Sequence, residues 1–219
     1  MLKRSGCMPP IPELEAIRKA QILDAALRTI AEHGCANVTM DDICRTAGLS
    51  KGGLNHYYKS KNDLFMAAFQ EFFKQIFQRG EDTMNLYDDP MEKLLSFSWL
   101  YNESDPDLHI GYPILFDFMA IAVHEHDYRK IFEDWIENWL ALLKKALLLG
   151  QKQDRFQGVD PDAAVMTISA IYQGIATRWY LAPDTHSTAW ALDSLERSVR
   201  GLLASYGETS QVKGGGYHK

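Results

Sequence analysis

The sequence predicts an all-α fold. Apolar residues recur three and four positions apart in almost every segment of the 219-residue chain, as they do on one face of an amphipathic helix. Ser, Thr or Asp residues precede many of these segments and glycine or proline follows them, which are start and stop signals of helices. The alternating pattern of strands is not convincing anywhere in the sequence. We therefore expect three short helices, a connecting helix and about five longer ones.

Three short helices are expected at the N-terminal end. The first has one apolar face: Leu23, Ala26, Leu27 and Ile30. Gly34 follows as a C-cap, because glycine readily adopts the left-handed conformation that ends many helices. Thr39 and Asp42 form a capping-box pattern, with Asp in place of the usual Glu, and open a second helix that Gly48 closes. Ser50 caps a third, short helix.

Longer helices follow. Their expected ranges are 61–78, 90–101, 110–124, 132–150, 161–182 and 192–206. Ser60 and the Asp-Pro dipeptides at 89–90 and 160–161 signal helix starts, whereas Pro113 bends or begins its helix and Gly207 closes the last one. The expected parts of the chain are a three-helix head over 13–60, a larger helical domain over 61–207, and flexible termini at 1–12 and 208–219.

Composition excludes several classes of protein. A content of 46% hydrophobic and 24% charged residues is typical of a folded globular chain and excludes global disorder. The longest apolar stretch, 110–123, is interrupted by Pro113 and Asp117 and is shorter than the roughly 20 residues that a membrane span needs. The N-terminus lacks the pattern of a secretory signal, so we expect a cytoplasmic protein. Cys35 and Cys44 are expected to be small buried residues, and no metal or cofactor is expected.

Charge is distributed unevenly along the chain. The net charge is −6, yet residues 1–78 hold 10 Lys and Arg against 8 Asp and Glu, whereas residues 79–219 hold 13 against 21. A mildly basic N-terminal part is therefore joined to a strongly acidic remainder. This asymmetry favours an anionic partner for the N-terminal part alone.

The segment from Thr39 to Lys61, TMDDICRTAGLSKGGLNHYYKSK, predicts a helix-turn-helix. A glycine-containing turn joins two short helices, and in this motif the second helix enters the major groove of DNA. Leu49, Leu54 and Tyr58 are suited to hold that helix in place. Lysine, asparagine and histidine side chains between residues 51 and 61 supply hydrogen-bond donors for DNA.

Gly52 and Gly53 are unusual at the start of a helix, because each glycine costs about 1 kcal/mol relative to alanine. They make sense if a side chain there would collide with DNA and prevent close approach of the helix N-terminus. The alternative is that the two glycines merely loosen a turn at the surface. Their place after a capped helix and the AGLS turn favours DNA binding.

The whole N-terminal pattern resembles the TetR family of transcriptional regulators. The matching segments within residues 17–66 are IAEHG (30–34), VTMDDI (38–43), AGLSKGGL (47–54) and YYKSKNDL (57–64). The resemblance implies a homodimer that binds palindromic double-stranded operator DNA, usually as a repressor. It also implies that a divergent C-terminal domain binds a small-molecule effector and forms the dimer.

The resemblance also implies individual DNA contacts. The positions concerned are Thr39, Ser50, Lys51, Gly52, Gly53, Asn55, His56, Tyr57 and Lys61. Thr39 and Lys61 match phosphate-contacting positions, and Tyr57 falls where many members have a phosphate-contacting histidine. Residues 51–53 and His56 match positions that read or pack against bases, although His56 is also compatible with an ordinary exposed histidine. Asn55 departs from the pattern, because tyrosine is usual there.

The C-terminal half is rich in aromatic and methionine side chains that are candidates for an effector pocket. The candidates are Trp99, Phe116, Asp117, Met119, Trp135, Trp139, Tyr172 and Arg178. For any single aromatic residue, plain core is the favoured interpretation. Asp117 interrupts an apolar run, so it is either a counter-charge for a cationic ligand, a surface residue, or a partner of Arg178, and the last two are favoured.

Dimerisation is expected through the last two helices, packed with their partners as a four-helix bundle. The candidate interface residues are Trp179, Trp190, Leu195, Val199 and Leu202, each of which could instead belong to the core of one protomer. Two heads spaced about 34–36 Å apart would meet successive major grooves. The helix over 61–78 is the expected lever through which an effector changes that spacing.

The competing function is a helical metal-dependent enzyme built on His124, His126 and Asp127. Residues two positions apart face different sides of a helix, whereas helical zinc pairs use HExxH spacing. Polar residues at a helix end explain this cluster better, and catalytic residues are not expected.

Overall fold

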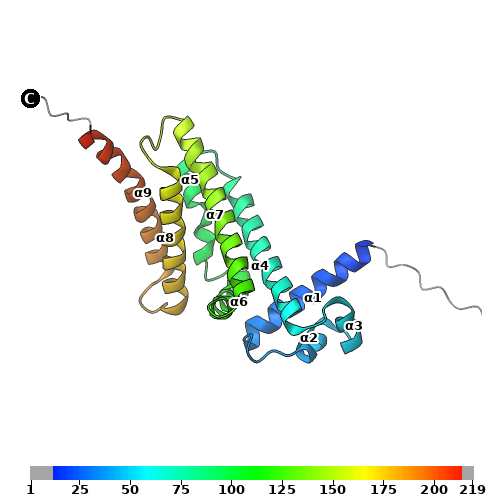
Figure 1. Cartoon of the computed structure of the whole chain (residues 1–219). Helices are drawn as coiled ribbons and strands as arrows, with labels where there is room; N and C mark the ends of the chain where they lie inside the picture. The colour runs from blue at the N-terminus through cyan, green and yellow to red at the C-terminus, as the bar shows by residue number, and fades with distance from the viewer. Residues whose placement is uncertain (1–11, 214–219) are drawn as a thin grey trace, which may run out of the picture.

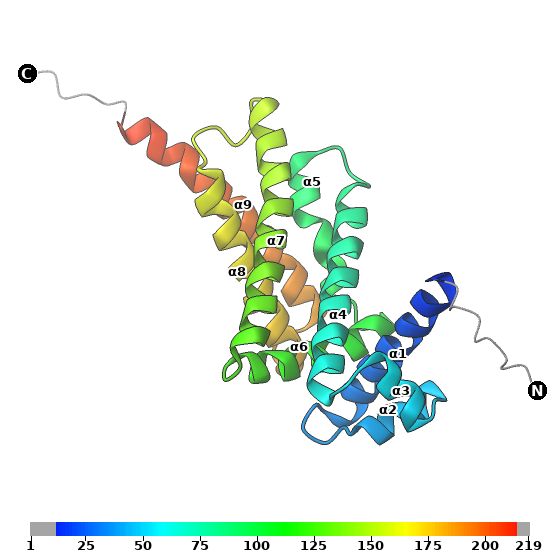
Figure 2. The same cartoon turned by 45° about the vertical axis from the view of Figure 1, so that its right-hand side comes forward.

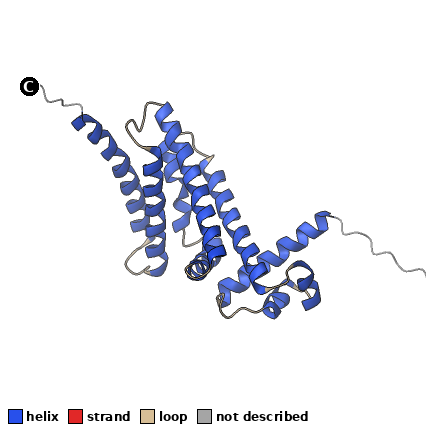
Figure 3. Ribbon diagram, viewed as in Figure 1, coloured by secondary structure: helices blue, strands red, loops and turns tan. Residues whose placement is uncertain are grey.

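The computed structural model describes residues 12–213, with side chains over residues 12–206. Within that range the chain forms nine α-helices, one 3-10 helix and no strand, which confirms the all-α prediction (Figure 3). The elements are α1 (Pro12–His33), α2 (Met40–Ala47), α3 (Lys51–Tyr57), α4 (Lys61–Met84), α5 (Pro90–Leu95), η1 (Ser96–Tyr101), α6 (Pro106–Ala122), α7 (His126–Lys152), α8 (Pro161–Leu181) and α9 (Thr188–Lys213). Of the flexible termini expected at 1–12 and 208–219, residues 1–11 and 214–219 lie outside the described residues, whereas residue 12 begins α1 and residues 208–213 belong to α9.

The helices form a small head and a larger body (Figure 1). Helices α1 to α3 make up the head at one end of the molecule, and α4 leads from it into the body. Helices α8 and α9 lie side by side on the flank of the body farthest from the head, and the turned view in Figure 2 keeps this order. Among the described helices none is long and apolar enough to cross a membrane.

Local capping interactions build the head as the sequence predicts. The hydroxyl of Thr39 accepts a hydrogen bond from the N–H of Asp42 at 3.2 Å, and the Asp42 carboxylate accepts the N–H of Thr39 at 2.8 Å. Gly48 ends α2 with a φ of 63°, a conformation that favours glycine. The Ser50 hydroxyl then accepts the N–H of Gly53 at 3.1 Å and starts α3. The crossing of α2 and α3 is thus set by side chains within the segment itself.

Several body helices are longer than predicted. Helix α6 begins at Pro106 because Asp105 caps it, accepting the N–H of Asp107 at 3.0 Å, and it continues through Pro113. Helix α7 already begins at His126 and α4 continues to Met84. Helix α9 runs past Gly207, so this glycine does not close it. A single glycine costs only about 1 kcal/mol inside a helix, which the rest of α9 can absorb.

The hydrophobic core of the head continues into the body. Ile22, Ile43 and Leu54 of the head belong to the same buried cluster as Phe69 of α4 and Phe118 of α6. A second cluster fills the rest of the body between α4, η1 and α6 to α9. The boundary proposed at residue 60 therefore marks a change of helix, whereas the packing runs across it.

Candidate nucleic-acid interface and ligand cavity

Helix α3 presents one face to solvent and one to the head. Lys51, Gly52, Asn55 and His56 are exposed, whereas Leu54 is fully buried and anchors the helix against the core. Because buried and exposed positions alternate with the helical period, the donor-rich side chains share the outer face. This arrangement leaves the outer face of α3 available to a groove of DNA.

The two glycines of α3 have different surroundings. A Cβ placed on Gly52 would meet nothing within 4 Å, so the position opens directly outward. A Cβ on Gly53 would lie 3.3 Å from the hydroxyl oxygen of Ser50, which is the capping group of the same helix. Gly53 is therefore explained by the cap. Nothing inside the head requires glycine at Gly52, which fits a close approach from outside.

Lys51 and Tyr57 differ in how firmly the head holds them. The Lys51 ammonium lies 3.0 Å from the carboxylate of Asp41, with both side chains mostly exposed. Such surface pairs contribute little, so Lys51 can exchange this partner for a phosphate. Tyr57 is half-buried and its ring meets that of His56 edge-on at 5.0 Å between centroids. Tyr57 is thus positioned at the rim of the exposed face.

Lys61 is engaged within the protein. Its ammonium donates to the backbone carbonyl of Cys35 at 2.9 Å and lies 4.9 Å from the ring centroid of Phe65. This contact corrects the simple expectation of a lysine free for phosphate, because Lys61 also ties α4 to the loop after α1. Thr39 remains exposed at the start of α2, as a phosphate-contacting position requires.

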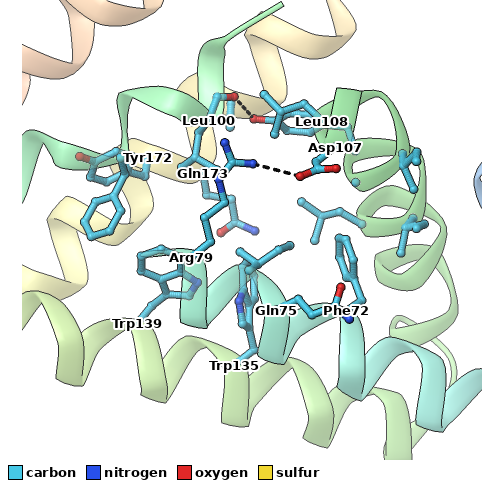
Figure 4. A pocket seen from close by; sticks show the side chains of 18 of the residues that line it. Phe72, Gln75, Arg79, Leu100, Asp107, Leu108, Trp135, Trp139, Tyr172 and Gln173 are labelled. Atoms are coloured by element: carbon cyan, nitrogen blue, oxygen red, sulfur yellow. Dashed lines mark hydrogen bonds and ion pairs between the residues drawn. The ribbon is translucent and has the colours of Figure 1, made fainter. Parts of the chain in front are cut away.

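A cavity of about 300 Å³ lies between α1 of the head and α4, η1 and α6 to α8 of the body (Figure 4). This volume is at the lower end of the range for small-molecule sites, about 300–1,000 Å³. Its aromatic lining consists of Phe72, Phe97, Trp99, Tyr112, Trp135, Trp139 and Tyr172. Figure 4 shows Trp135 and Trp139 rising from α7, with Arg79 of α4 reaching across toward Asp107. Helices of both core clusters thus enclose one apolar space.

Five of the eight residues expected at an effector pocket line this cavity. They are Trp99, Met119, Trp135, Trp139 and Tyr172. Phe116 does not belong to the lining; its ring packs against those of Tyr112 and Tyr180 at 6.2 and 5.7 Å. Arg178 is exposed on α8. Phe116 and Arg178 belong to helices that line the cavity, but their side chains lie outside the lining.

Asp117 also lies away from the cavity, and its partner is a backbone group. One carboxylate oxygen accepts a hydrogen bond from the N–H of Cys35 at 2.6 Å. This contact differs from the three alternatives that the sequence suggested for Asp117, which were a counter-charge for a cationic ligand, a surface position and a pair with Arg178. Burial, reinforced by the negative charge of Asp117, raises the pKa of the Cys35 thiol to about 12. Asp117 therefore joins α6 to the loop that follows α1.

Arg79 is the main charged group of the cavity and was not among the sequence candidates. Its guanidinium lies 4.1 Å from the ring centroid of Trp99 and forms ion pairs with Asp105 and, at 3.5 Å, with Asp107. The hydrogen bond from Arg79 lowers the pKa of the Asp105 carboxyl. The Asp105-Pro106 dipeptide was a usable sequence signal for this site, since it marks the start of α6.

The expected dimer residues divide into buried and half-buried sets. Trp179, Leu195 and Val199 are buried in the core of the protomer, which is the alternative that the sequence left open for them. Trp190 and Leu202 are half-buried at its edge. The large apolar side chains that α8 and the described part of α9 expose are Met166 (63%), Leu181 (62%) and Leu192 (38%). Exposed Gly174 and Gly201 have open space around them, so these helices allow close approach of another surface.

The residues of the alternative metal site are exposed around the turn between α6 and α7. His124, His126 and Asp127 all face solvent. In the part of the chain that the structure describes, no group of three or more His, Cys, Asp or Glu residues is placed to hold a metal ion.

Two family models match the chain. The model described as "Bacterial regulatory proteins, tetR family" matches residues 22–68, which contain α2, α3 and their caps. The model described as "BetI-type transcriptional repressor, C-terminal" matches residues 112–204, from α6 into α9.

The chain belongs to the TetR family.

Curated TetR-family relatives agree with these matches. The regulator BetI of Agrobacterium fabrum is 36% identical over 98 residues, which span 45% of this chain and 47% of that protein. The regulator PksA of Bacillus subtilis is 27% identical over 170 residues, or 76% and 80% of the two chains. The aligned part thus spans about half of the BetI relative.

Solved TetR-family structures share the fold. A transcriptional regulator of Cytophaga hutchinsonii has a TM-score of 0.77 at 20% identity, covering 88% of this chain and 97% of that one. A regulator from Saccharomonospora viridis, solved in complex with choline, has a TM-score of 0.73 at 21% identity, covering 86% and 96%. At this level of identity the likeness concerns the arrangement of the helices.

Proposed function

We propose that this TetR-family protein is a DNA-binding transcriptional repressor in the cytoplasm, where bacterial DNA lies. A homodimer binds a palindromic operator through α3 of each head, and a small effector in the body cavity releases it. The observation that carries the proposal is the outward-facing N-terminal half of α3. Exposed Lys51, Gly52, Asn55 and His56 share that face, and Gly52 has no packing reason to lack a side chain.

The roles on this face follow from their chemistry. Lys51 supplies a cation for a phosphate or for guanine, and Asn55 can form two hydrogen bonds with adenine. Gly52 lets the backbone of α3 come close to DNA. Thr39 and Tyr57, at the edges of the face, suit phosphate contacts that position the head.

The head takes part in the cavity directly, because Asp24, Leu27 and Arg28 of α1 belong to its lining. Two further helices connect the cavity with the head. Helix α4 begins at the head and carries Phe72, Gln75 and Arg79 in the cavity lining. Helix α6 lines the cavity and holds the loop after α1 through Asp117. An effector acts through them only if it binds one head spacing more tightly than the other. Such coupling typically changes operator affinity by about 5–150-fold.

For the dimer, the exposed stripe of α8 and α9 replaces the buried residues expected from the sequence. Met166, Leu181 and Leu192 supply apolar area, and Gly174 lets a partner helix approach. Two such helix pairs form a four-helix interface with two-fold symmetry, which matches the symmetry of a palindromic operator.

A mobility shift with DNA from upstream of the protein's own gene tests this function. We expect a specific complex whose affinity falls steeply with salt, because phosphate contacts release counterions. Lys51→Ala should weaken binding and lower the salt slope. Lys130→Ala, which removes an equally exposed lysine from α7 of the body, is the matched control. A complex that survives Lys51→Ala unchanged, or a control that weakens it equally, contradicts the proposed face.

A further inference from the structure

Three indole N–H groups in the cavity have no hydrogen-bond partner. The Nε1 atoms of Trp99, Trp135 and Trp139 are buried, and no described residue accepts from them. All three side chains line the same cavity, and Trp139 is only 8% exposed. Buried polar groups in native proteins are nearly always paired, so three orphan donors in one space call for an acceptor.

The charged groups of the lining already have partners. Arg79 pairs with Asp105 and Asp107, and Arg28 pairs with Asp24 at 3.0 Å. A charged ligand inside the cavity would have to break the Arg79–Asp105 pair, in which the Asp105 side chain is only 10% exposed, or remain without a counter-charge in apolar surroundings, and both are unfavourable. The cavity therefore favours an uncharged molecule.

Part of the aromatic surface of the lining is occupied as well. The guanidinium of Arg79 already covers the ring of Trp99 at 4.1 Å, which is the position that an ammonium ligand would take. The ring of Trp135 packs against Phe73 at 4.8 Å and that of Trp139 against Phe97 at 4.9 Å. These contacts take up part of the ring surface that a cation in the cavity would use.

The tyrosine hydroxyls of the lining are already used. Tyr112 donates to the carbonyl of Leu100 at 2.7 Å, and Tyr172 donates to the carbonyl of Leu94 at 2.5 Å. Burial raises the pKa of both phenols, which keeps them protonated as donors. The indole N–H groups are thus the unpaired aromatic donors of the described lining.

We propose that the effector is an uncharged, largely apolar molecule carrying a carbonyl or similar oxygen that accepts hydrogen bonds from these indole groups. This inference rests on the proposed function, because it takes the cavity to be the effector site. The apolar part of the ligand is buried against the hydrophobic lining. Its oxygen accepts a hydrogen bond from each indole N–H that it reaches, which removes the cost of leaving that donor unpaired.

Matched probes on the full-length dimer test the class of ligand. The probes are 3-phenylpropanamide, 3-phenylpropanoate, 3-phenylpropylamine and propylbenzene, with choline as a quaternary cation, and tryptophan fluorescence or calorimetry reports binding. We expect the amide to bind most tightly. The hydrocarbon should be about two- to tenfold weaker, the range of one neutral hydrogen bond. Tighter binding of the amine, the carboxylate or choline overturns the proposal, as does an amide that binds no better than propylbenzene, or no binding at all.

Donor-deleting variants separate the hydrogen bonds from the shape of the cavity. Trp135→Phe and Trp139→Phe keep an aromatic ring but remove the N–H. At least one should weaken the amide about two- to tenfold while changing propylbenzene much less. Equal losses for both probes in both variants mean that only packing has changed, and they contradict the proposal.

The mobility shift described above keeps this test distinct from the proposed function. If the protein binds its operator but does not bind the amide probe as expected, the proposed ligand class is wrong and the proposed function as a regulator is still supported. If the amide binds in the cavity but no DNA complex forms, the proposed function is wrong.

Discussion

The carboxylate of Asp117, in the second half of α6, accepts a hydrogen bond from the backbone N–H of Cys35 at 2.6 Å, across 82 positions of sequence. The Lys61 ammonium binds the carbonyl of the same Cys35 at 2.9 Å. One peptide segment is thus held from two sides, by the helix that lines the cavity and by the helix that enters the body. This pair of contacts connects the loop after α1 with α6, a helix that lines the ligand cavity.

Asp117→Ala should destabilise the protein by about 1.5–3 kcal/mol, the range for a hydrogen bond to a charged acceptor. Asp117→Asn should recover most of this loss, since the amide oxygen can still accept from Cys35. Urea unfolding measures both variants. Asp134→Ala on the exposed face of α7 is the control, and we expect it to change stability little. If Asp117→Ala matches this control, the bond does not hold the head.

Gly52→Ala should separate stability from DNA binding. The added methyl group meets open space, so alanine should stabilise α3 by about 0.5–1 kcal/mol. The same group would face the DNA, and we expect operator affinity to fall about tenfold, or about 1.4 kcal/mol. Thermal unfolding and the mobility shift measure the two effects. Unchanged operator affinity would contradict the proposal that Gly52 allows the backbone of α3 to approach DNA closely.

Gly80→Ala should have the opposite effect on stability. A Cβ on Gly80 would lie 2.6 Å from the Trp139 ring and 3.3 Å from that of Phe97, both in the packed body. Overpacking of this kind costs about 1–3 kcal/mol, which exceeds the helical preference for alanine. Urea unfolding should show the loss, and the tryptophan emission should shift because Trp139 moves. A gain in stability like that of Gly52→Ala would contradict the packing described here.

Acid should weaken the protein partly through Asp105. Because Arg79 lowers the pKa of this carboxyl in the folded state, its contribution is present above the unfolded value of about 3.9. The contribution is lost as the pH falls through the lower folded value. Asp105→Asn keeps a cap for α6 but removes the charge, so it should be less stable than the parent at neutral pH, and the difference should shrink as the pH falls below about 3.9. Urea midpoints across pH, with Asp127→Asn as an exposed control, check this.

The dimer surface can be tested with exposed residues alone. Met166→Asp and Leu181→Asp place a charge on the outer face of α8, where 63% and 62% of the two side chains are exposed. We expect folded monomers in sedimentation experiments, because a charge buried at an interface without a partner is costly. Leu86→Asp changes an apolar residue that is 79% exposed near the end of α4 and should remain dimeric. Dimers of all three variants would place the interface elsewhere.

Local signals predicted the head better than the body. The caps formed by Thr39, Gly48 and Ser50 act over three or four residues, so their pattern is visible in the sequence and reappears in the structure. The partner of Asp117 lies 82 residues away, and no spacing rule connects the two. Only the packed arrangement of α1 and α6 reveals that contact.

Periodicity identifies the buried face of a helix but not what covers it. Leu195 and Val199 lie on the apolar face of α9, which the protomer uses for its own core. The exposed stripe on α8 contains Met166 and Gly174, whose hydrophobic signal is weak. Similarly, Phe116 and Trp135 both lie on aromatic-rich helices, and only Trp135 reaches the cavity. Which of these residues line the cavity or face outward on α8 and α9 can therefore be determined only from the tertiary structure.

The shared core of head and body limits how this protein can be recombined with its relatives. A DNA-binding head for a different operator cannot be transplanted by cutting at residue 60, since the cut divides the buried cluster that Ile43 and Leu54 share with Phe69 and Phe118. A workable chimaera has to carry the first half of α4 and the facing surface of α6 together with the donor's α1 to α3. Substitutions on the outer face of α3 can change the preference for a DNA sequence, and they leave that packing unchanged.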